Sequence, residues 1–130
     1  MRRIITFGTF DVFHVGHVNI LERAYSLGDY LIVGVSSDNL NFNKKKRYPV
    51  YNQSDRVKII SSLRFVNEVF IEESLEQKLD YIRTYNADVL VMGDDWTGKF
   101  DWVKTDCDVV YLPRTPSIST TEIIEIVRSI

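Results

Sequence analysis

The chain has 130 residues, of which 45% are hydrophobic and 26% are charged, and these proportions are typical of one soluble globular domain. Its formal net charge of −2 argues against general nucleic-acid binding but allows a small anionic ligand. No apolar run reaches the roughly 18 residues that a membrane span needs, and the N-terminal apolar run is too short for a signal peptide. We therefore expect a cytoplasmic protein without a membrane partner. The single cysteine, Cys107, excludes an intrachain disulfide and a cysteine-rich zinc site, and we expect it to be buried.

The first third of the chain predicts a strand, a loop, a helix and a second strand. Apolar residues over Arg3–Phe7 indicate a buried strand, and a polar loop follows over 8–16. Apolar residues at helical spacing predict a helix from about His17 to Leu27, with Gly28 as its stop. The continuous apolar run Tyr30–Val35 predicts a second buried strand.

The rest of the chain alternates in the same way. A polar segment over 36–49, with one helical turn at 38–40, precedes strands expected over 66–71, 89–92 and 109–112. Three capping-box pairs, which begin at Asn52, Ser74 and Ser119, predict the starts of three further helices. The buried face of the last helix is expected to be Ile123, Ile126, Val127 and Ile130.

Mostly apolar strands that alternate with helices imply a parallel sheet covered on both faces. We predict an α/β fold: a Rossmann-like, doubly wound open sheet of about five parallel strands, with residues 1–130 forming a single domain.

The loop after the first strand holds both histidines of the chain, His14 and His17. Three residues apart at a helix start, they lie on one side of the first turn, and Gly16 lets a ligand approach the backbone. Helix N-termini bind phosphate, so this is a candidate phosphate site, although a solvent-facing pair is an open alternative. A zinc site would lack further ligands. The basic run over 44–47 is either a second part of that site or a solvated loop.

Two motifs carry a more specific signal. Gly8-Thr9-Phe10-Asp11 followed by His14-Val15-Gly16-His17 resembles the signature of the HxGH nucleotidyltransferase superfamily, in its cytidylyltransferase branch. The run Arg114-Thr115-Pro116-Ser117-Ile118-Ser119-Thr120-Thr121 resembles the second signature of that branch, Arg-Thr-x-Gly-Ile-Ser-Thr-Thr. The similarity extends over essentially the whole chain. It implies transfer of a cytidylyl group from CTP to glycerol 3-phosphate, giving CDP-glycerol and pyrophosphate for teichoic-acid or capsule polymers.

The resemblance also implies roles for individual residues. The catalytic residues would be His14, His17, Lys44, Lys46 and Arg114. The nucleotide would be bound by Thr9, Phe10, His14, Val15, Gly16, His17, Lys46, Asp95, Arg114, Thr115, Pro116, Ser117, Ile118, Ser119, Thr120 and Thr121. The acceptor would be bound by Lys44, Arg64 and Lys78. Mg²⁺ would arrive with CTP rather than in a metal site of the protein, and the enzyme would be a homodimer.

Three departures from the family pattern leave alternatives open. Ser117 stands where the second signature has glycine, which would strain a left-handed backbone by about 1 kcal/mol or more. Leu75 stands where members that use glycerol 3-phosphate carry tryptophan, and one extra residue lies near Pro49. The acceptor could therefore be another phosphorylated alcohol. An adenylyltransferase of the FAD-synthetase type and a non-catalytic nucleotide-binding module are the remaining alternatives.

Overall fold

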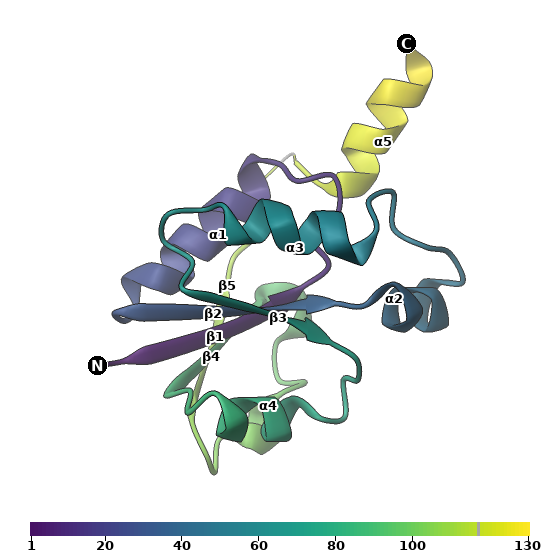
Figure 1. The fold of residues 1–130 in the computed structure, drawn as a ribbon. Coiled ribbons are helices and arrows are strands. Elements are labelled where there is room, and N and C mark those ends of the chain that lie inside the picture. Colours follow the sequence, from purple (N-terminus) through teal and green to yellow (C-terminus); the bar gives the residue numbers. More distant parts are fainter. Residues whose placement is uncertain (117) are drawn as a thin grey trace.

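A five-stranded parallel sheet forms the centre of the protein (Figure 1). The computed structural model describes residues 1–116 and 118–130. The strand order is β3-β2-β1-β4-β5, and every neighbouring pair is parallel. The strands are β1 (Arg3–Gly8), β2 (Tyr30–Ser36), β3 (Glu68–Glu72), β4 (Val89–Gly93) and β5 (Asp108–Leu112). The predicted doubly wound sheet is confirmed, and its order reverses between β1 and β4, where such sheets bind ligands.

Helices cover both faces of this sheet. In Figure 1, α1 and α3 lie on one face and α4 lies on the other. The helices are α1 (Val15–Ser26), α2 (Asp38–Lys45), α3 (Gln53–Ser61), α4 (Lys78–Thr84) and α5 (Thr120–Ser129), with short 3₁₀ helices η1 (Asp94–Trp96) and η2 (Asp101–Val103). Helix α1 starts two residues before its predicted start, and the turn expected at 38–40 is the beginning of α2.

The core is divided between the two faces because side chains alternate along each strand. Ile4 packs with Leu21 and Ile60 below α1 and α3, whereas Ile5 packs with Ile82 on the α4 face. Cys107 belongs to the second cluster and is buried, as expected. Both clusters hold the strands in register, so the loops at their carboxyl ends start from fixed positions.

The last helix differs from its prediction. Ile126 and Val127 are 62% and 63% exposed, Ile130 is 99% exposed, and no residue of α5 is buried within the described chain. Figure 1 shows α5 projecting away from the sheet. The expected buried face, which includes Ile123, is therefore wrong for a single copy, because apolar periodicity indicates which side of a helix is apolar but not what covers it.

Two of the three predicted capping residues are confirmed. Asn52 and Ser119 accept hydrogen bonds from the backbone at the starts of α3 and α5. Ser74 is wrong as a cap: its hydroxyl donates to Glu76 at 2.8 Å. Helix α4 begins after Gln77, which makes no capping side-chain bond among the described residues.

Candidate active site

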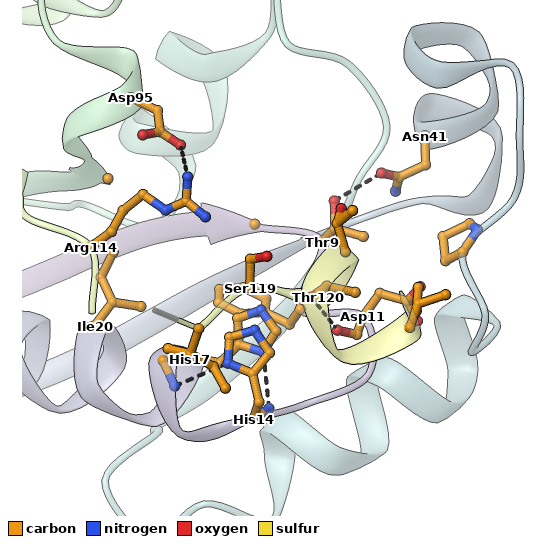
Figure 2. A pocket seen from close by; sticks show the side chains of 18 of the residues that line it. Thr9, Asp11, His14, His17, Ile20, Asn41, Asp95, Arg114, Ser119 and Thr120 are labelled. Atoms are coloured by element: carbon orange, nitrogen blue, oxygen red, sulfur yellow. Dashed lines mark hydrogen bonds and ion pairs between the residues drawn. The ribbon is translucent and has the colours of Figure 1, made fainter. Parts of the chain in front are cut away.

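A cavity of about 480 Å³ lies over the carboxyl ends of β1 and β4. It is bounded by the loop after β1, the segment after α2, the start of η1 and the segment from Arg114 into α5. Figure 2 shows the two histidines near Ser119 and Thr120, with Arg114 and Asp95 to one side and Thr9 and Asn41 to the other. Both sequence signatures therefore meet at one place.

The histidine side chains are oriented by backbone hydrogen bonds at the start of α1. The backbone N–H of Gly16 donates to His14 Nδ1 at 3.0 Å, and the backbone N–H of His14 donates to His17 Nδ1 at 3.2 Å. The two rings stack with centroids 3.8 Å apart. Because each Nδ1 accepts, the proton of each neutral ring lies on Nε2. The pair therefore presents two N–H donors.

Both imidazoles are neutral at physiological pH. Burial, and then the neighbouring His14, lower the pKa of His17 to about 3. Burial and the guanidinium of Arg114 also lower the pKa of His14. A neutral ring does not carry the extra proton that an imidazolium would give up as an acid. It still donates an N–H hydrogen bond to a phosphate oxygen, and no charged ring has to be desolvated for this bond to form.

Asp11 fixes the loop between β1 and α1. Phe10 and Val12 adopt left-handed backbone conformations (φ 55° and 47°), which is unusual for bulky and branched residues. The Asp11 carboxylate accepts backbone N–H groups from Val12 at 3.1 Å, Val50 at 2.7 Å and Tyr51 at 2.9 Å. Asp11 can therefore lie beside a site for phosphate, because its carboxylate binds backbone N–H groups. It also fastens the segment after α2 to this loop.

Arg56 is a site residue that sequence reasoning missed. Its side chain is fully buried in α3. The guanidinium donates to the carbonyl oxygens of Thr9 at 2.9 Å, Ser36 at 2.7 Å and Tyr51 at 3.0 Å, and it pairs with Asp38 at 2.7 Å. It thus joins the ends of β1 and β2 to the starts of α2 and α3. The available signal was its spacing, four residues before the buried Ile60, which puts both on one side of the helix.

The second signature is bonded to the first. Thr120 donates through its hydroxyl to the carbonyl oxygen of Asp11 at 2.8 Å, and Asn19 of α1 donates to the Thr115 hydroxyl at 3.0 Å. Arg114 pairs with Asp95 at 3.3 Å. Ser117 lies outside the described residues. The predicted nucleotide residues that line the cavity are Thr9, Phe10, His14, Gly16, His17, Asp95, Arg114, Thr115, Ile118, Ser119, Thr120 and Thr121.

The predicted cationic residues are placed unevenly. Lys45 and Arg47 line the cavity, whereas their neighbours Lys44 and Lys46 do not line it in the described structure. Lys46 ends α2 in a left-handed conformation (φ 60°).

Two further predicted cations do not line the cavity in the described structure. Arg64 lies between α3 and the start of β3, at the amino end of that strand. The cavity lies over the carboxyl ends of the strands, so one copy of the chain does not bring Arg64 to it. Lys78 is fully buried at the start of α4.

The carboxylates at the cavity have partners within the protein. Among residues 1–116 and 118–130, no group of three or more His, Cys, Asp or Glu side chains is arranged to hold one. Of the carboxylates at the cavity, Asp11 is engaged by backbone N–H groups and Asp95 faces Arg114.

No helix in the described part of the chain is long and apolar enough to cross a membrane.

Known proteins are similar to this chain in sequence and in fold. A family model described as cytidylyltransferase-like matches residues 5–126. The chain is 51% identical over 125 residues to glycerol-3-phosphate cytidylyltransferase of Bacillus subtilis (strain 168), covering 96% of both chains. It is 32% identical over 138 residues to an FAD synthase of Pyrococcus horikoshii, covering 98% of this chain and 93% of that protein. A structure of a lipopolysaccharide core biosynthesis protein from Thermoplasma volcanium shares the fold, with a TM-score of 0.75 at 22% identity over 88% of this chain and 98% of that one.

Proposed function

Because this chain belongs to the cytidylyltransferase-like family, we propose that it transfers a cytidylyl group from CTP to glycerol 3-phosphate, releasing pyrophosphate. The observation that carries the proposal is the 51% identity to a glycerol-3-phosphate cytidylyltransferase across 96% of both chains. The adenylyl alternative is weaker, because the FAD synthase of Pyrococcus horikoshii is only 32% identical. We assign the product, CDP-glycerol, to the synthesis of teichoic-acid or capsule polymers.

The proposed reaction is a direct displacement at the α-phosphorus of CTP. A phosphate oxygen of glycerol 3-phosphate forms a bond to that phosphorus, and the bond from it to the bridging oxygen of the β-phosphate breaks. The electron pair leaves with pyrophosphate. The nucleophile is already an anion, so the enzyme needs to position two phosphates and stabilise charge rather than supply a strong base. The neutral histidines support this chemistry, since both present Nε2–H donors at the start of α1.

The nucleotide is assigned to the histidine side of the cavity. The N-terminus of α1 carries partial positive charge, and Arg114 and the hydroxyls of Thr115 and Thr120 lie around the same space. These groups suit a triphosphate. The hydrogen bonds from Asn19 to Thr115 and from Thr120 to the Asp11 carbonyl oxygen support a cradle that is formed before CTP binds.

The predicted lysine and metal roles belong to the same proposal. Lys44 and Lys46 alternate along the chain with Lys45 and Arg47, which line the cavity, so a small movement of this segment brings either lysine to a bound phosphate. Mg²⁺ would be held by the nucleotide phosphates and water, because the nearby carboxylates already have partners. It would neutralise phosphate charge there.

We also propose a cytoplasmic homodimer. The apolar side of α5 is exposed in one copy, and Ile124 and Arg128 of the same helix line the cavity. A second copy packed on this helix would cover the apolar side and steady the second signature. Sedimentation equilibrium tests this state: a mass of two chains is expected, and a mass of one chain at micromolar concentration would contradict it.

A pyrophosphate-release assay tests the proposed reaction. CTP and ATP are each combined with Mg²⁺ and glycerol 3-phosphate, ribitol 5-phosphate, phosphocholine or phosphoethanolamine. The highest kcat/KM is expected for CTP with glycerol 3-phosphate. Faster release from ATP would favour the adenylyltransferase alternative, and a faster reaction with another alcohol phosphate would reassign the acceptor. CTP binding without pyrophosphate release for any acceptor would favour a binding module.

A further inference from the structure

A buried ion pair lies below the floor of the cavity, and it joins Lys78, which the family resemblance places at the acceptor, to Glu72, which has no assigned role. Lys78, the first residue of α4, is 0% exposed, and its ammonium contacts the carboxylate of Glu72, which is 2% exposed at the end of β3. The ammonium also lies over the ring of Phe7, 3.7 Å from its centroid, and 4.9 Å from the centroid of the Phe100 ring. It is therefore held by one carboxylate and two aromatic faces.

The pair has a direction relative to the cavity. Phe7 lines the cavity, whereas no residue of β3 or α4 lines it among those described. The positive end of the pair thus lies under Phe7, and the negative end lies toward the β3 edge of the sheet. An oriented charge pair in an apolar surround has a stronger field than it would have in water. The field at this part of the floor favours an anion.

The region above Phe7 is the part of the cavity left for the second substrate. The nucleotide is assigned to the histidine side, and the lining also includes Asn41, Lys45 and Trp96, which that assignment does not use. Lys44 is the other charged group near the pair: partial burial lowers its pKa, and the Glu72 carboxylate raises it. The second substrate is an alcohol phosphate, so its phosphate would lie between α2 and the aromatic floor.

We propose that Glu72 is a positioning residue of the acceptor site: it holds the Lys78 ammonium beneath Phe7 and thereby strengthens binding of the acceptor phosphate, but not of CTP. This proposal rests on the proposed function, because it assumes two phosphorylated substrates in one cavity. Glu72 acts through Lys78 and does not touch either substrate.

The need for a counter-ion follows from the surroundings of Lys78. Burial lowers the pKa of Lys78, and the Glu72 carboxylate counters that effect. A buried ammonium that loses its only carboxylate partner gives up its proton rather than remain an isolated ion. Glu72→Gln therefore removes both charges of the pair. The charged groups that face Lys78 are Glu72 from β3 and Lys44 from α2; β1 and the η1–η2 segment contribute aromatic rings.

The test measures KM for each substrate in Glu72→Gln, with Glu68→Gln as the matched control. Glu68 is on the same strand and also in an ion pair, with Arg3 at 3.4 Å, but at the far end of β3. We expect Glu72→Gln to raise KM for glycerol 3-phosphate by about tenfold or more, with KM for CTP changed by about twofold or less. The ratio of mutant to wild-type acceptor KM should decrease as the pH falls, because Lys78 regains its proton in the mutant. The protonation of the substrate affects both enzymes equally, so it cancels in the ratio at each pH. Glu68→Gln should change neither KM.

A second pair of variants separates this role from a general structural one. Lys78→Met and the double variant E72Q/K78M should have the same acceptor KM, because Glu72 acts only through Lys78. An unchanged or lower acceptor KM in Glu72→Gln, an equal rise for both substrates, or a further loss in the double variant would overturn the proposal. If the wild type prefers another alcohol phosphate, the proposed acceptor fails and the same comparison on that alcohol still decides the role of Glu72. If nothing is turned over, the Kd of inorganic phosphate for the CTP-loaded protein replaces KM.

Discussion

Replacing Arg56 with lysine should destabilise the edge of the sheet that carries the site. The guanidinium donates to three backbone carbonyl oxygens, at 2.7–3.0 Å, and to the Asp38 carboxylate. A lysine keeps the positive charge, but one nitrogen cannot reach acceptors on three separate segments. At least two of the acceptors then lose this donor, although the Ser36 carbonyl oxygen keeps the Asn41 amide as a donor.

The size of the loss follows from the number of unsatisfied groups. Each acceptor that loses its partner costs about 1–3 kcal/mol, so two of them lower the free energy of unfolding by about 2–6 kcal/mol. Unfolding entropy is about 2.1 cal/mol/K per residue, which for 130 residues is about 270 cal/mol/K. The melting temperature of Arg56→Lys should therefore fall by about 7–22 °C.

Urea unfolding followed by tryptophan fluorescence measures this loss directly. The control is Arg83→Lys, because Arg83 forms an ion pair with Asp106 while its side chain is 60% exposed. A surface pair of this kind contributes about 0–1 kcal/mol. A loss below about 1 kcal/mol in Arg56→Lys, equal to the control, would refute the claim that the buried guanidinium holds these segments together.

Two further predictions concern the loop after β1. The pKa of His17 is about 3 in the folded chain and about 6.5 in the unfolded chain, so the unfolded state binds more protons between these values and stability rises with pH across that window. Between pH 7 and pH 5 the wild type should lose about 2 kcal/mol more than His17→Asn in urea unfolding; equal losses would contradict the lowered pKa. Asp11→Asn should raise KM for CTP by about tenfold, because the backbone N–H of Val50 loses its acceptor and the basic segment detaches. An unchanged KM for CTP, from steady-state kinetics, would show that Asp11 does not position this segment.

The sheet could be predicted because each strand carries its own local signal. A run such as Tyr30–Val35 has the continuous apolar pattern of a strand buried on both faces, and Gly28 marks the helix end before it. The place of the site followed from this alternation, since the loop with both histidines comes after a parallel strand. Strand order was not contained in any local pattern, because it depends on which distant runs pair.

The remainder depended on contacts between distant residues. Arg56, Lys78 and Asp11 are charged, and charged residues are usually solvated. The spacing of Arg56 before Ile60 indicated its side of the helix, but no local pattern showed which partners from other segments each of the three would have. The exposed side of α5 is the opposite case. Ile126 and Val127 recur as a core face would, and only the fold shows that one copy leaves them uncovered.

Product formation and CTP binding in His17→Ala together test the role of the neutral histidine. His17 presents a neutral N–H donor to the reacting phosphates, and this hydrogen bond strengthens as charge develops on them. Formation of CDP-glycerol under saturating substrates should slow by about 10²-fold or more, while the Kd of CTP, from calorimetry, changes much less. An equal loss in both would make His17 a ground-state phosphate clamp, and an unchanged rate would contradict the central claim.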